Sequence, residues 1–175
     1  MYILSAQRDQ PGNGPYIDPF PRYMEYLDAN RERFPPGAYQ LATSGWYFGF
    51  SDPRGPHDAW LEAVEIAEPA KGDRKQFRTV SIRIRLLGPY HDGWIELVYP
   101  TVYAYRLGMA HAEGGHGDWR YDEFRVTDDG HLLHEIEWWT YREGGSWLIE
   151  ADDVQHRWIP FTGEYSAAPS TEVAE

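Results

Sequence analysis

The chain has 175 residues and a formal net charge of −12 at neutral pH, and 42% of its residues are hydrophobic against 25% charged. These proportions are typical of a globular protein with one substantial core and argue against disorder of the whole chain. The absence of cysteine excludes disulfides, thiol nucleophiles and thiolate zinc sites. The N-terminus lacks the apolar run of a signal peptide and no apolar run approaches a membrane span, so we expect a cytoplasmic protein.

The acidic charge is concentrated in the second half of the chain. Residues 1–87 contain 11 Lys or Arg and 11 Asp or Glu, whereas residues 88–175 contain 5 and 17. Direct binding of a nucleic-acid backbone is disfavoured, because the surfaces that bind it are basic. An acidic surface attracts a basic partner, but it also keeps a protein soluble without any partner.

The N-terminal part of the chain predicts two helices. A short strand at residues 2–6 and a proline-rich loop come first. Residues 21–34 have apolar side chains at helical spacing, and two prolines from Pro35 onward end the run. An aromatic stripe between residues 38 and 50 predicts a short second helix and then irregular chain, because two glycines weaken a longer helix. We interpret this stripe as core packing.

From residue 57 onward, hydrophobic and polar residues alternate, which predicts strands. Six strands are expected, near residues 57–66, 80–86, 95–107, 119–127, 132–141 and 147–159. Short turn-like connections favour an antiparallel meander. The sequence therefore predicts an α+β fold in which one or two N-terminal helices pack on a largely meander sheet of about six strands. Residues 1–163 are expected to form a single domain, and residues 164–175 a disordered tail.

Two segments share a His-Asp pair between Gly-Pro and Trp, GPHDAW at 55–60 and GPYHDGW at 88–94. In a meander, both pairs lie at the same end of the sheet on neighbouring strands. Imidazole and carboxylate groups suit zinc, iron or manganese, and they can transfer protons near neutral pH. The pairs therefore have two interpretations. Either they are turns stabilised by their Asp side chains, or they form a metal site from His57, Asp58, His91 and Asp92.

A second polar cluster follows a run of glycines. His116 and Asp118, with a distant His such as His156, imitate the facial triad of non-haem iron oxygenases. A glycine-flanked loop with polar caps is the simpler explanation, because the meander places His116 at the opposite end of the sheet from His57. The same reasoning places the turn that contains His131 at the end where His57 lies.

Catalytic motifs are absent from the rest of the sequence. No serine lies in a Gly-x-Ser-x-Gly elbow, and no glycine-rich phosphate loop joins a strand to a helix. The run HLLHEIEWW at 131–139 lacks the second His of a zinc-binding His-Glu-x-x-His helix, and it alternates like a strand. His134 falls on its apolar face, so we expect a hydrogen-bonded core histidine.

Two classes of function remain, with a third as a minor alternative. The first is a protein-binding domain that captures a basic partner through charge and buried aromatic residues, as an inhibitor or immunity-type protein does. Its candidate contact residues are Glu135, Glu137, Trp139, Glu150, Asp152 and Asp153. The second is a metal-dependent hydrolase or metal-binding domain that uses the two His-Asp pairs and a divalent metal, whereas the first requires no cofactor. The third is a domain that binds a small apolar ligand in an aromatic pocket.

Overall fold

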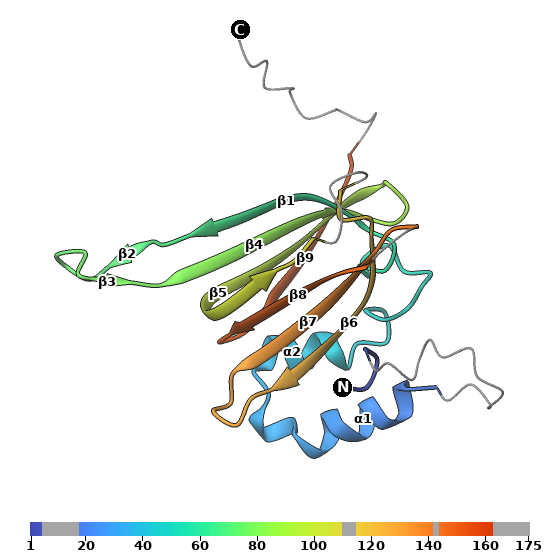
Figure 1. Cartoon of the computed structure of the whole chain (residues 1–175), viewed down its shortest axis with the longest axis horizontal. Coiled ribbons are helices and arrows are strands. Elements are labelled where there is room, and N and C mark those ends of the chain that lie inside the picture. Colours follow the sequence, from blue (N-terminus) through green and yellow to red (C-terminus); the bar gives the residue numbers. More distant parts are fainter. Residues whose placement is uncertain (5–17, 110–114, 142–143, 163–175) are drawn as a thin grey trace, which may run out of the picture.

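The computed structural model describes residues 1–4, 18–109, 115–141 and 144–162 (Figure 1). Helices α1 (Phe20–Ala29) and α2 (Pro36–Ala42), with the 3-10 turn η1 (Arg31–Arg33) between them, come first. Seven strands then form one antiparallel sheet, namely β1 (Trp60–Ala67), β4 (Val80–Leu87), β5 (Gly93–Leu107), β6 (Asp118–Val126), β7 (Leu132–Trp139), β8 (Gly144–Ala151) and β9 (Gln155–Pro160). A separate pair consists of β2 (Ala70–Lys71) and β3 (Phe77–Arg78). The predicted α+β class is confirmed, with one strand more in the main sheet than expected.

The helices lie close to their predicted positions. Each has a proline in its first turn, where the missing N–H of proline costs nothing. The predicted strand at 2–6 is wrong for residues 2–4, which form no strand, and residues 5 and 6 lie outside the described part. The predicted tail at 164–175 also lies outside it. Neither helix of the described chain is long and apolar enough to cross a membrane.

The sheet curls into a barrel that has one weak seam. The strands follow the order β4-β1-β6-β7-β8-β5, and β5 also pairs with β4, which completes the ring. Neighbouring strands in the ring share several residue pairs, except for β1 and β6, which meet only at Trp60 and Asp118. Most neighbours are consecutive strands joined by hairpins, as expected of a meander.

Strand β5 bends in its middle and then runs back (Figure 1). Its first half pairs with β4 and β9, and its second half, from Val102, pairs with β8. The register shifts opposite the segment that contains Pro100, which cannot donate a hydrogen bond to a neighbouring strand.

Because of this bend, His116 and His131 each lie at the end of the sheet opposite to the predicted one. Because β5 returns toward its starting end, β6 begins beside the start of β1, where Asp118 pairs with Trp60. His116 therefore lies at the same end of the sheet as His57, and the turn that contains His131 lies at the other end. A straight β5 gives the opposite result, which explains the wrong prediction.

Helix α1 lies along the edge of β6. The hydroxyl of Tyr23 donates to the carbonyl of Phe124 at 2.9 Å and accepts the N–H of the same residue at 2.8 Å. The hydroxyl of Tyr26 accepts the N–H of Val126 at 2.9 Å. Tyrosine side chains thus satisfy backbone groups along the part of the β6 edge that has no strand partner in the described chain.

The barrel interior is rich in aromatic side chains. The largest fully buried ones are Trp119, Trp138, Trp147, Tyr23, Tyr47, Tyr99 and Phe124. The interpretation of the 38–50 stripe as core packing holds for Tyr47, whereas Phe50 is 63% exposed. The hairpin of β1 and β4 continues through β2 and β3 and projects from the barrel (Figure 1).

Candidate functional site

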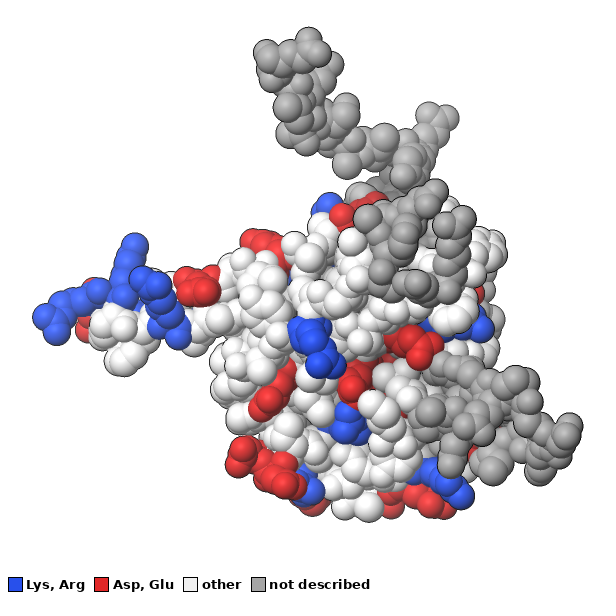
Figure 2. Space-filling model, in the orientation of Figure 1, with Lys and Arg blue, Asp and Glu red and all other residues white. Residues whose placement is uncertain are grey.

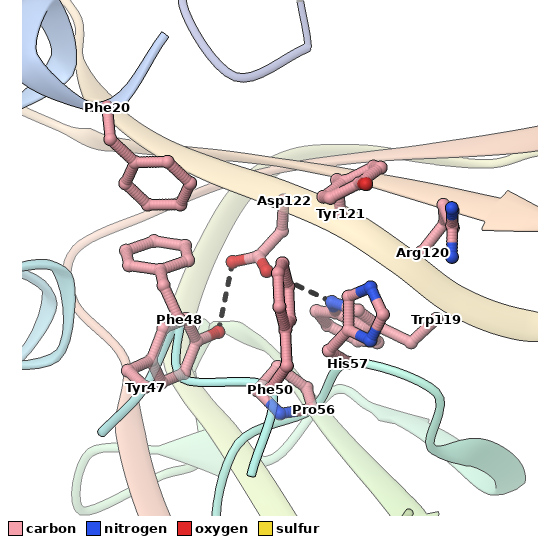
Figure 3. A pocket seen from close by; sticks show the side chains of 10 residues that line it. All are labelled: Phe20, Tyr47, Phe48, Phe50, Pro56, His57, Trp119, Arg120, Tyr121 and Asp122. Carbon is pink, nitrogen blue, oxygen red and sulfur yellow. Dashed lines mark hydrogen bonds between the residues drawn. The ribbon is translucent and has the colours of Figure 1, made fainter. Parts of the chain in front are cut away.

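A surface hollow opens between the start of α1, the loop that follows α2, and strand β6 (Figure 3). Its volume, including the space at its open mouth, is about 260 Å³. Aromatic rings form most of its wall. The lining residues are Phe20, Tyr47, Phe48, Phe50, Pro56, His57, Trp119, Arg120, Tyr121 and Asp122.

A bulge in β6 brings an acidic and an aromatic side chain to the same face. Trp119 pairs with Trp138 and Asp122 pairs with Ile136, and the register shifts between these two pairs. Both partners on β7 are buried in the barrel. Trp119 and Asp122, three residues apart, therefore both point inward, whereas regular alternation would place them on opposite faces.

Asp122 forms the floor of the hollow and is almost fully buried. Its Oδ2 accepts hydrogen bonds from the hydroxyl of Tyr47 at 3.0 Å and from Nε2 of His134 at 2.9 Å. Its Oδ1 accepts Nε1–H of Trp119 at 3.0 Å; Figure 3 shows the bonds from Tyr47 and Trp119. Behind the floor, the hydroxyl of Tyr99 lies 2.6 Å from Nδ1 of His134. The prediction of a hydrogen-bonded core histidine at position 134 is confirmed.

The proton positions in this cluster follow from burial. Burial raises the pKa of Tyr99 and that of Tyr47 well above the ordinary value, so both hydroxyls keep their protons at neutral pH. Tyr47 therefore donates to Asp122, and the ring of His134 lies between Asp122 and the hydroxyl of Tyr99. The floor of the hollow thus holds a buried carboxylate in a network of hydrogen bonds.

His57 and Arg120 lie at the mouth of the hollow (Figure 3). The His57 ring contacts those of Phe50 and Tyr121, with centroids 4.3 and 5.5 Å away. Its Nδ1 lies 3.2 Å from Asp58, whose other oxygen lies 3.9 Å from Arg120. Burial lowers the pKa of His57, an effect that outweighs the opposing attraction of Asp58. The imidazole is therefore neutral at neutral pH, and Asp58 balances the charge of Arg120.

The two His-Asp segments form turns. Asp58 and His91 have φ angles of 64° and 56°, in the left-handed region that side chains other than glycine seldom adopt. The N–H of His91 donates to the carbonyl of Gly88 at 2.9 Å, which closes its turn. Both segments lie at the same end of the sheet, as predicted. However, the His91 ring packs on Trp60, with centroids 4.6 Å apart, whereas His57 packs at the hollow.

The structure assembles no metal site from the predicted ligands. Across the described ranges, no three His, Asp or Glu side chains are grouped so that they could hold a metal ion. The four residues of the two His-Asp pairs are therefore not brought together as a ligand set. His116 packs on Trp138, Asp118 accepts Nε1–H of Trp60 at 2.8 Å, and Nε2 of His156 lies 3.0 Å from a backbone carbonyl.

Most predicted partner-binding residues make contacts within the chain. Asp153 accepts hydrogen bonds from two backbone N–H groups at the start of α2, at 2.8 and 2.9 Å. Glu135 forms an ion pair with Arg125, and Glu150 lies 2.8 Å from Nδ1 of His131. These three carboxylates already have partners and stabilise the fold.

The remaining three predicted partner-binding residues lie elsewhere on β7 and after β8. Asp152 accepts the N–H of Thr101 at 3.1 Å, at the bend of β5. Glu137 is half-buried, and Trp139 is exposed at the end of β7. Four of the five carboxylates in this set, those of Glu135, Glu150, Asp152 and Asp153, therefore already have partners within the chain.

Sequence patterns did not identify Asp122 as part of a site, because the bulge is invisible to regular alternation. The one available signal is local, an acidic residue in the aromatic run WRYDEF at 119–124. The chain matches no protein-family model, no curated protein and no solved structure. The function therefore has to be inferred from the geometry of the hollow itself.

Proposed function

We propose that this protein binds a small organic cation in the hollow, with the apolar part of the ligand against the aromatic rings. The supporting observation is a buried carboxylate, Asp122, that accepts three hydrogen bonds at the floor of an aromatic hollow. Aromatic faces attract cations, and more strongly when water is excluded. A carboxylate in surroundings of low dielectric constant adds a Coulomb attraction. The proposal extends the expected apolar-ligand function by adding a requirement for charge.

The dimensions and charges of the site restrict the ligand further. The volume of about 260 Å³ includes the open space at the mouth, so the enclosed part of the hollow is smaller and fits only a small group such as an ammonium. At the mouth, Asp58 balances Arg120 and His57 is neutral, so neither side chain opposes the entry of a cation. The net charge of −12 also raises the local concentration of cations. Capture of a basic protein partner through Glu135, Glu137, Trp139, Glu150, Asp152 and Asp153 stays a prediction.

Two probes of the same shape test the requirement for charge. Benzyltrimethylammonium carries a quaternary nitrogen cation, whereas neopentylbenzene has a neutral carbon at the same position. Titration of each into the full chain, followed by tryptophan fluorescence and by NMR, should show tighter binding of the ammonium by about tenfold or more. Equal affinity for the neutral probe would overturn the proposed cation site, and failure of both probes to bind would overturn the hollow as a binding site.

Phe50→Ala should weaken binding of benzyltrimethylammonium by about fivefold to tenfold, because one aromatic wall of the hollow is lost. Phe50 is 63% exposed, so its truncation leaves the core intact. Phe77→Ala is the matched control, since Phe77 is 62% exposed on β3 and does not line the hollow. Unchanged affinity in the Phe50 variant would contradict the proposed position of the ligand.

Binding of the cationic probe should also weaken in acid. Because the pKa of His57 is lowered, its ring becomes charged only as the pH falls below the ordinary histidine value of about 6.5. Affinity should be constant from pH 8 to 6.5 and fall below that range, when an imidazolium at the mouth repels the ligand. The His57→Gln variant has no imidazole that can become charged, so its affinity for the cationic probe should fall less in acid. A pH profile identical in the two proteins would show that His57 does not face the bound cation.

A further inference from the structure

We propose that strand β1 joins two copies of this chain. In this arrangement, the two β1 edges pair antiparallel across a two-fold axis, and the basic hairpin tip of each copy lies on the acidic body of the other. The inference is independent of the ligand proposed for the hollow. It depends on the free edge of β1, on its exposed apolar face and on the charge of the tip.

One edge of β1 has no strand partner beyond its first residue. The strand pairs with β4 from Trp60 to Ala67, whereas its other edge meets β6 only at Trp60. Within the described chain, the edge from residue 61 to residue 67 is therefore open to a further strand. Such an edge is a template for strand addition. Two identical edges can satisfy each other when they are related by a two-fold axis.

The apolar face of β1 is partly uncovered. Val64 pairs with Ile84 and Ile66 pairs with Ile82, so these side chains share one face of the sheet. Both isoleucines on β4 are fully buried, but Val64 and Ile66 are 38% and 41% exposed. With the two-fold axis near these residues, apolar side chains of the second copy would lie opposite or diagonal to them and would extend the apolar surface across the new strand pair.

The acidic residues of β1 do not prevent this pairing. Charges on an edge strand usually protect it from association, and β1 contains Glu62 and Glu65. On the neighbouring strand, however, Arg85 lies 3.3 Å from Glu62 and Arg83 lies 3.9 Å from Glu65. Each glutamate faces an arginine of its own hairpin, which reduces the repulsion between two copies.

The hairpin tip, residues 68–78, is basic on a body that is otherwise acidic (Figure 2). It contains four Lys or Arg and two acidic residues, whereas the rest of the chain contains 12 and 26. In antiparallel pairing, residues at equal distances from the two-fold axis face each other, so the tip of each copy extends toward the start of β1 in the other copy. That end of β1 is already bonded to Trp119 of β6 through Asp58 and Ala59, so the tip lies beside the start of β6. Asp118, which accepts a bond from Trp60, is acidic and lies at the same end.

This match between a basic tip and an acidic strand base favours a second copy over a nucleic acid. The acidic body of the chain would repel a polyanion that followed the tip. Between two copies, the same charges attract, and the two-fold symmetry doubles each contact.

The first test is the mass of the full chain in solution, measured by sedimentation and by light scattering over a range of concentrations. A concentration-dependent dimer is expected, and its dissociation constant should rise with salt. Val64→Lys should raise that constant by about tenfold or more, since it places a charge on the apolar face. Met24→Lys, at an exposed apolar position on α1, should leave it unchanged. A chain that remains monomeric at all concentrations would overturn the proposal.

Cross-linking tests the axis directly, because the chain contains no cysteine. Single cysteines at positions 62 to 66 of β1 should give a disulfide-linked dimer, with a maximum at the residue nearest the two-fold axis. Directly opposite side chains in an antiparallel pair lie about 4.5–5.5 Å apart at Cβ, close to disulfide reach. Met24→Cys should remain unlinked. Equal linking at all positions, including the control, would overturn the assignment of the interface to β1.

Charge reversal tests the tip. Lys71→Glu combined with Arg74→Glu should raise the dissociation constant by about tenfold or more. The control, Arg22→Glu combined with Arg106→Glu, makes the same change in net charge at exposed positions of the body. Lys75 is left unchanged because its φ of 54° lies in the left-handed region, so a substitution there would also change the stability of the turn. Equal effects of the two pairs would show that net charge, and not the tip, controls association.

Discussion

Replacing Asp122 with Ala should lower the free energy of unfolding by about 3–5 kcal/mol. The carboxylate accepts hydrogen bonds from Tyr47, Trp119 and His134, all of which are buried. Without Asp122, three donors lose their acceptor in a place that water reaches poorly, and each loses the solvation it had in the unfolded chain. Urea unfolding followed by circular dichroism gives the measurement.

Tyr47→Phe is the control for this loss. It removes one donor together with its hydrogen bond and leaves the aromatic ring in place, so about 1 kcal/mol is expected. A loss below about 1 kcal/mol in the Asp122 variant itself would contradict the hydrogen-bonded cluster. Such a result would also count against the cation site, which depends on the same buried carboxylate.

Glu123→Ala should have the second-largest effect, a loss of about 2–4 kcal/mol. Glu123 is fully buried, although it lies on the outer face of β6. Its carboxylate accepts the N–H groups of Tyr2 at 2.8 Å and Leu4 at 3.2 Å, and it lies 3.0 Å from Nε of Arg125. Its removal would release the N-terminal residues, including the buried Ile3, from the sheet.

The surface ion pair between Glu62 and Arg85 is the comparison for the buried Glu123. Glu62→Ala breaks the contact with Arg85, where both side chains are partly exposed, and should cost at most about 1 kcal/mol. Comparable losses in the two variants, measured by thermal unfolding, would mean that burial is not what gives Glu123 its importance. Hydrogen exchange at Ile3 would show separately whether the N-terminal residues had detached.

Most of the fold could be predicted because its strands alternate. In β4, Ile82, Ile84 and Leu86 are all fully buried, as their spacing predicts. The bend in β5 could not be predicted, since Pro100 shows that the strand is interrupted there but not that it reverses. Because the bend was not predicted, His116 and His131 were assigned to the wrong ends of the sheet.

The candidate site depended on features that sequence patterns do not record. The β6 bulge places Trp119 and Asp122 together, and the loop after α2 contributes Tyr47 from 75 residues away. Sequence patterns gave correct expectations for individual residues, as with the buried His134. They could not show which distant side chain completes each hydrogen bond.

The docking of α1 on β6 has a consequence for synthesis of the chain. Tyr23 and Tyr26 bond to residues that follow them by 101 and 100 positions. At about 5–20 residues per second, the helix leaves the ribosome roughly 5–20 s before β6 does. During that interval α1 can pack only on residues near it in sequence, such as Phe34 and Phe48. The hairpins form from short-range contacts, so the helix docks on β6 only after that strand has been made.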